Sequence, residues 1–219
     1  MNKGVCQLKK YDLIIFDLDG TLLDTSEGIY NSVRFAEMSM GFKPIPDERL
    51  KEFVGPPPKK MYMSVYGVSE DVAMEAAKKH REYGRTKAIY EAVPYPDMAD
   101  VLGNLKDDGY KLAVATLKSQ KIAESILELT GLLSYFDVIV GMDESERLTK
   151  ADTIKMAMQK IGITDTEHCV LVGDSEYDYG GAMAVGIDFI AAMYGFGVEP
   201  FEKMDVKKIQ GISELLLYC

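Results

Sequence analysis

The protein has 219 residues, of which 47% are hydrophobic and 27% are charged, and its formal net charge is −10. This length fits one large domain, or one domain with a smaller insert, and the hydrophobic share is sufficient for a buried core. A chain this acidic repels the phosphates of nucleic acid, so we expect no nucleic-acid partner.

The cysteines and the apolar runs indicate where the protein works. Cys6, Cys169 and Cys219 lie far apart and form no C-x-x-C pair, which argues against a disulfide framework or a cysteine zinc site and favours a reducing compartment. Residues 1–12 lack the apolar centre of a signal peptide, and no run approaches the roughly 18 apolar residues of a membrane span. We therefore expect a cytoplasmic protein that does not associate with membranes. We also expect a monomer or a homodimer.

Five short apolar segments are predicted to be buried strands, because they are rich in Val, Ile, Leu and aromatic residues and are flanked by turn residues. They span residues 11–16, 110–116, 135–141, 168–174 and, more weakly, 187–192. Helical patterns at residues 98–109, 119–131 and 150–162 separate the last four. Strands that alternate with helices predict an α/β fold, a Rossmann-like parallel sheet covered on both faces.

A long segment between the first two predicted strands breaks this alternation. Its helical patterns cover residues 25–40, 47–54, 58–66 and 69–88. A loop of this length without structure of its own would be unusual, and proline-rich stretches punctuate it and close it. We therefore predict a helical domain at residues 24–90, inserted into a core formed by residues 1–23 and 91–219.

Polar side chains follow the predicted strands at the edge of the sheet where sites of α/β proteins lie. They comprise Asp17, Asp19, Thr21, Thr116, Lys118, Lys150, Asp174, Ser175 and Asp178. Four carboxylates at one locus repel one another, and a divalent cation relieves the repulsion. Mg²⁺ takes carboxylate oxygens and then favours a phosphate oxygen as a further ligand. With a lysine and a hydroxyl beside it, this set predicts phosphoryl transfer.

Four of these motifs resemble, in order and context, those of the haloacid dehalogenase-like phosphohydrolases. They are DLDGT (17–21), Thr116, Lys150 and GDSEYD (173–178). The helical insert resembles the family's α-helical (C1-type) cap, and RLKEFVGPP (49–57) and YEAVPYPD (90–97) are similar to the phosphoglycolate-phosphatase-like branch. The resemblance implies the family's fold and a Mg²⁺-dependent phosphatase. Its substrates would be small phosphomonoesters, namely phosphoglycolate-like compounds or nucleoside or sugar monophosphates.

The resemblance also implies roles for the two leading carboxylates. Asp17 would be the nucleophile that forms an aspartyl-phosphate, and an ordinary Asp pKa of about 3.9 would leave it ionised at neutral pH. Asp19 would be the general acid and then the general base. Positions i and i+2 of an extended chain point the same way, which supports this pairing.

The remaining motif residues would hold the metal and the phosphate. Mg²⁺ would be bound by Asp17, Asp174 and the backbone carbonyl of Asp19. The phosphoryl oxygens would be bound by Thr116, Leu117 and Lys150, with Lys118 as a competitor for such a contact. A second layer would contain Thr21, which orients Asp19, together with Asp178 and Ser175. Each residue has a simpler interpretation: Asp-x-Asp-Gly as a turn, Lys150 as a solvated side chain, and Ser175 as a helix cap.

Departures from the family pattern lie in the insert and its boundary, where specificity is decided. Pro58 follows Gly-Pro-Pro, where the branch usually has Leu. The segment 83–92 replaces a stretch that commonly contains glycine, and YPDM at 95–98 stands where YPG and an apolar residue are usual. These departures leave the substrate open. A β-phosphoglucomutase-like phosphomutase is the alternative within the family. A non-catalytic phosphoryl-binding or signalling protein is the alternative from another class.

Overall fold

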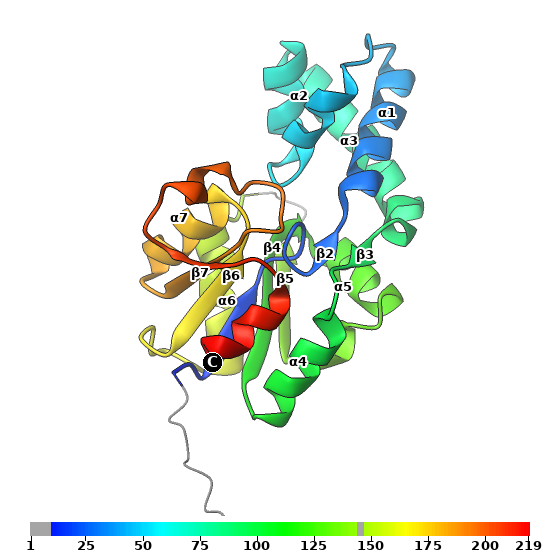
Figure 1. The fold of residues 1–219 in the computed structure, drawn as a ribbon. Helices are drawn as coiled ribbons and strands as arrows, with labels where there is room; N and C mark the ends of the chain where they lie inside the picture. The colour runs from blue at the N-terminus through cyan, green and yellow to red at the C-terminus, as the bar shows by residue number, and fades with distance from the viewer. Residues whose placement is uncertain (1–9, 144–146) are drawn as a thin grey trace, which may run out of the picture.

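A computed structural model describes residues 10–143 and 147–219 and shows a parallel six-stranded sheet with helices around it (Figure 1). From one edge to the other the strands are β5 (Val138–Met142), β4 (Lys111–Ser119), β1 (Leu13–Phe16), β6 (Cys169–Gly173), β7 (Asp188–Ala192) and β8 (Lys207–Ile209). The predicted α/β fold is confirmed, and each of the five expected segments contains a strand. Strand β8 was not predicted, because a three-residue strand with two lysines shows no apolar run.

The two faces of the sheet bury alternate residues of the same strand. In β1, Ile14 and Phe16 belong to one hydrophobic cluster, and Leu13 and Ile15 belong to the other. This alternation results from the two-residue period of an extended chain. Helices α4 (Met98–Asp107) and α5 (Gln120–Leu129) and the 3₁₀ helix η5 (Ile212–Leu217) cover the first cluster, and α6 (Lys150–Ile161) and α7 (Glu176–Val185) cover the second.

The chain between residues 25 and 92 is largely helical, and its longer helices stand together at one end of the sheet (Figure 1). It contains α1 (Ser26–Met40), η1 (Asp47–Phe53), α2 (Pro58–Tyr66), α3 (Glu70–Thr86) and η2 (Ala88–Tyr90). These helices enclose a hydrophobic cluster of their own, which includes Val33, Phe53 and Tyr62. The chain enters this helical segment through β2 (Leu23–Asp24) and leaves it through β3 (Val93–Pro94), and these two short strands pair in an antiparallel ribbon. The division into two domains at residues 24–90 stays a prediction.

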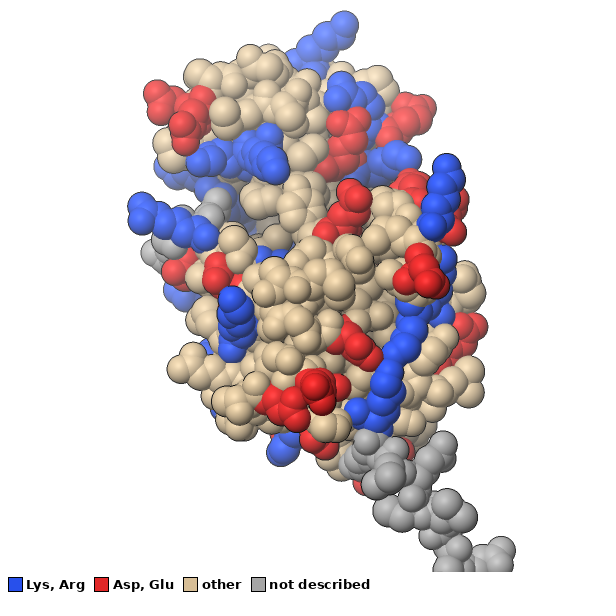
Figure 2. Space-filling view, turned by 90° about the vertical axis from the view of Figure 1, so that its left-hand side faces the viewer, with Lys and Arg blue, Asp and Glu red and all other residues tan. Residues whose placement is uncertain are grey.

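The surface carries charges of both signs (Figure 2), and the described cysteines are unpaired. On the face drawn in Figure 2, acidic and basic side chains are interspersed. Within the described residues, no helix is both long enough and apolar enough to cross a membrane. Cys169 and Cys219 are free thiols, and Cys6 lies outside the described residues.

Candidate active site

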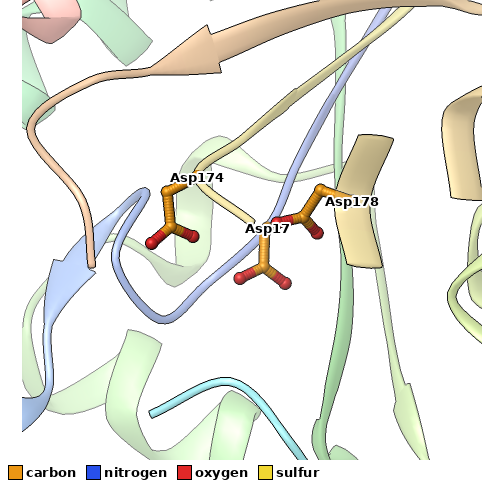
Figure 3. Close-up of side chains that lie close together, drawn as sticks. All are labelled: Asp17, Asp174 and Asp178. Carbon is orange, nitrogen blue, oxygen red and sulfur yellow. The ribbon is translucent and has the colours of Figure 1, made fainter. Parts of the chain in front are cut away.

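Three buried carboxylates meet at the carboxyl end of the sheet (Figure 3). Asp17 follows β1, Asp174 follows β6, and Asp178 lies in the first turn of α7. Because β1 and β6 are neighbouring parallel strands, their ends bring Asp17 and Asp174 to the same place. One oxygen from each of the three carboxylates lies within 4.8 Å of the others. The sheet topology therefore gathers residues that are more than 150 positions apart in the chain.

Lys150 is the cation of this cluster. It is the first residue of α6, its side chain is only 4% exposed, and its Nζ contacts Asp17 and lies 2.6 Å from Asp178. The start of α6 is fixed by a capping box between Thr149 and Asp152. The structure therefore excludes the simpler interpretation of Lys150 as a solvated side chain.

Burial shifts the protonation of these groups. The pKa of Asp17 is raised to about 7, mainly by burial; Lys150 lowers this pKa, and the charges of Asp178 and Asp19 raise it. Burial also raises the pKa of Asp174, again with a contribution from Asp178. The ordinary pKa expected for Asp17 from sequence is therefore wrong for its buried position. A single lysine does not fully compensate three carboxylates, so the cluster favours binding a further cation.

Asp19 is held by two side chains. One carboxylate oxygen accepts a hydrogen bond from the hydroxyl of Thr25, and the other lies 3.0 Å from Lys118 Nζ. Thr25 precedes α1, at the point where the chain enters the helical segment. Thr21, which was expected to orient Asp19, is buried, and its hydroxyl has no hydrogen-bond partner among the described residues. Thr25 was not predicted to be a site residue; its position at the start of a predicted helix was the available signal.

The predicted phosphate-binding residues lie in the same cavity as the carboxylates. Thr116, Leu117 and Lys150 line it, and so do Val54 and Gly55 of the helical segment. Thr116 is buried in the second half of β4, and its hydroxyl accepts a hydrogen bond from the backbone N–H of Lys118 at 3.1 Å. The cavity is therefore bounded by the sheet on one side and by the predicted cap on the other.

Ser175 and Asp178 form a capping box at the start of α7. The hydroxyl of Ser175 donates to Asp178 Oδ2 at 2.6 Å, and the backbone N–H of Ser175 donates to the same oxygen at 3.0 Å. The other oxygen of Asp178 pairs with Lys150. Ser175 thus caps the helix, and it also lines the carboxylate cavity and fixes a carboxylate there.

A loop that was not predicted to contribute to the site holds Asp174. After β7, the backbone N–H groups of Phe196 and Gly197 donate to Asp174 Oδ2 at 2.7 and 3.3 Å. At Gly195, a Cβ atom would lie 2.3 Å from the Cβ of Asp174 and 2.4 Å from the carbonyl oxygen of Gly20. Gly195 is therefore required for the close approach of this loop to both segments. The pattern Gly-Phe-Gly soon after the last predicted strand was the available signal.

We expect Gly195→Ala to lower catalytic activity more than tenfold and to reduce the free energy of unfolding by about 1–3 kcal/mol, because the new methyl group displaces Asp174 or the Gly20 backbone. Steady-state kinetics and urea unfolding measure the two effects. Gly180→Ala is the matched control, since a Cβ at this exposed position of α7 meets no atom within 4 Å. Equal activity of Gly195→Ala and the wild type would show that Asp174 need not hold this position.

Comparison with known proteins identifies the family. The family model described as haloacid dehalogenase-like hydrolase matches residues 14–192. A 5'-nucleotidase of Pseudomonas aeruginosa is 36% identical over 191 residues, which cover 87% of this chain and 86% of that protein. The tyrosine-protein kinase PtkA of Mycobacterium tuberculosis is 33% identical over 86% of this chain, which spans 64% of the kinase's length. The crystal structure of a predicted phosphatase from Clostridium acetobutylicum is 35% identical, with a TM-score of 0.87, and the match covers 94% of this chain and 96% of that one.

The fold and the site define an α/β enzyme with an acidic centre at the carboxyl ends of its strands. The chain belongs to the haloacid dehalogenase-like hydrolases. The predicted family, and with it an enzyme of the phosphatase class that acts on small phosphate substrates, is confirmed.

Proposed function

We propose that this enzyme is a Mg²⁺-dependent phosphatase that hydrolyses small phosphomonoesters through an aspartyl-phosphate on Asp17. The observation that carries the proposal is the buried cluster of Asp17, Asp174 and Asp178 around Lys150. The same cavity offers Thr116 and the backbone at Leu117 to a phosphate group.

The residues fit a magnesium ion. Asp17 and Asp174 would bind it, with the backbone carbonyl of Asp19, and Asp178 would lie behind them. Three carboxyl groups with oxygens within 4.8 Å of one another offer hard oxygen ligands. When all three are ionised, they carry three negative charges against the single charge of Lys150, which a divalent cation offsets. When bound, the ion supplies positive charge that keeps the carboxylates ionised and binds a phosphate oxygen.

The protein's own groups account for the remaining steps. The carboxylate of Asp17 attacks phosphorus, and Asp19 gives a proton to the leaving oxygen. In the second half, Asp19 takes a proton from the water that hydrolyses the aspartyl-phosphate. Thr25 and Lys118 hold the carboxylate of Asp19 in place. Lys150 stabilises the charge on the phosphoryl oxygens, and its burial strengthens this effect.

The helical segment is proposed to be a cap that closes the site. Val54 and Gly55 of this segment line the carboxylate cavity. A second contact links the two parts, since Lys60 of α2 lies 3.4 Å from the hydroxyl of Tyr177 in α7. Closure of such a cap excludes water from the reacting groups.

Substrate choice rests on the relatives and on the resemblance. The name of the Pseudomonas relative supports nucleoside monophosphates, whereas the resemblance to the phosphoglycolate-phosphatase-like branch supports phosphoglycolate and related compounds. Sugar monophosphates stay a third candidate. A β-phosphoglucomutase-like activity and a non-catalytic or signalling role stay alternatives that the same assay addresses.

The test is a phosphate-release screen over a metabolite panel, run with and without Mg²⁺. We expect release from small phosphomonoesters that falls to background when a chelator removes the metal and returns when Mg²⁺ is added. Hexose phosphates that are isomerised without phosphate release would indicate the mutase. A stable phosphoryl group on the protein without turnover would indicate the signalling role.

A further inference from the structure

A second cavity, of about 120 Å³, adjoins the carboxylate cavity. The two cavities share Asp19, Gly55, Leu117 and Lys118 in their linings. If the phosphate of a substrate lies against Asp17, as the proposed function requires, the leaving oxygen lies near Asp19. The leaving group then extends into this second cavity, whose walls come from α1, α3, η1 and α5.

The lining of this leaving-group cavity is mainly apolar, with contributions from Ile29, Phe53, Ile122, Ile126 and Met142. Its charged residues already have partners. Lys118 pairs with Asp19, and Arg81 and Asp143 each already have a partner. An additional full charge on the leaving group would enter an apolar space without a dedicated counter-ion, which is unfavourable. The cavity therefore favours an uncharged group.

His80 of α3 supplies a polar group in this apolar wall. It is 8% exposed, and its Nδ1 lies 3.3 Å from the hydroxyl of Tyr62. Tyr62 is fully buried, and among the described residues its hydroxyl hydrogen-bonds only to His80. The hydroxyl proton is satisfied only if Tyr62 donates to Nδ1, which assigns the ring proton to Nε2. Nε2 is then the nitrogen left to donate to a ligand.

The imidazole is a neutral donor. Burial, together with the positive charges of Lys118 and Arg81, lowers the pKa of His80 to about 3. His80 therefore does not act as a cation for a carboxylate, and its contribution to recognition is a hydrogen bond.

We propose that His80 determines specificity by donating a hydrogen bond from Nε2–H to an acceptor on an uncharged, ring-sized leaving group, with Tyr62 as the residue that positions the imidazole. The cavity volume is similar to that of the roughly 150 Å³ cavity that admits benzene in another protein, so the cavity has about the room that one ring needs. The substrates are phosphomonoesters of alcohols that carry one ring with a hydrogen-bond acceptor.

The experiment compares esters of the same shape that differ in one atom. Benzyl phosphate is measured against the 2-, 3- and 4-pyridylmethyl phosphates near neutral pH, with phosphoglycolate as the charged comparison. A buried hydrogen bond gives the wild type a kcat/KM about tenfold higher for at least one pyridyl isomer than for benzyl phosphate. Phosphoglycolate is turned over less efficiently than either.

Two variants assign this preference to the pair of residues. His80→Leu removes the pyridyl preference and leaves kcat/KM for benzyl phosphate within about threefold of the wild type, which shows that the cavity is intact. Tyr62→Phe keeps the imidazole but reduces the pyridyl preference. Without the Tyr62 hydroxyl, Nδ1 has no hydrogen-bond donor and the ring proton is no longer fixed on Nε2. His80→Gln retains a donor and so part of the preference.

The outcomes separate this inference from the proposed function. A wild type that hydrolyses the panel without a pyridyl preference overturns the inference and leaves the phosphatase in place. A pyridyl preference that survives in His80→Leu also overturns the inference. If His80→Leu does not fold, a preference that survives unchanged in Tyr62→Phe overturns the inference. An enzyme that releases phosphate from no ester in the panel fails the proposed function instead.

Discussion

Asp17→Asn is expected to abolish phosphate release, with kcat lower by at least about 10⁴-fold. The amide cannot attack phosphorus, so no aspartyl-phosphate forms and Asp19 has no intermediate to hydrolyse. Asn has nearly the same shape as Asp and still faces Lys150, so the cavity is kept. A phosphate-release assay measures the loss, and mass spectrometry after rapid quenching measures the phosphoryl group on the protein.

Asp12→Asn is the matched control. Asp12 is exposed and directly precedes β1, whereas Asp17 follows the other end of this strand, and Asp12 lines neither cavity. It should retain wild-type turnover. Activity of Asp17→Asn within tenfold of the wild type would remove Asp17 as the nucleophile, and the aspartyl-phosphate mechanism with it.

Lys150→Met is expected to have the second large effect, on stability as well as on activity. Methionine fills the space of the lysine stem but leaves three buried carboxylates without their cation. Breaking a buried ion pair by removing one partner costs about 3–5 kcal/mol of unfolding free energy. We also expect kcat to fall at least about 100-fold, since the phosphoryl oxygens lose a positive group.

Magnesium provides an internal check on this result. The more negative site of Lys150→Met should gain more unfolding free energy from added Mg²⁺ than the wild type does, measured by urea unfolding with and without the metal. Lys155→Met, an exposed position on the same helix, is the control and should match the wild type. An unchanged stability of Lys150→Met without metal would mean that the carboxylates are protonated and need no cation.

Local patterns in the sequence determined the class of this protein. The apolar runs around Ile14, Leu112 and Leu171 predict buried strands because burial on both faces requires a nearly continuous apolar segment. The carboxylates Asp17 and Asp174 come directly after such runs, and neighbouring parallel strands bring the residues at their carboxyl ends to one edge of the sheet. These short-range features were sufficient for the α/β fold, the family and the location of the acidic centre.

Only the tertiary structure decided how the site residues are held. Thr25 and Lys118 meet at Asp19, the backbone of Phe196 and Gly197 meets Asp174, and Tyr62 meets His80. The residues of such pairs lie up to about a hundred positions apart along the chain, so the local periodicity of the sequence does not predict these contacts. The raised pKa of Asp17 has the same origin, because burial and neighbouring charges act through space. The sequence determined which chemical groups reach the edge of the sheet, and the folded structure decided which partners hold each of them there.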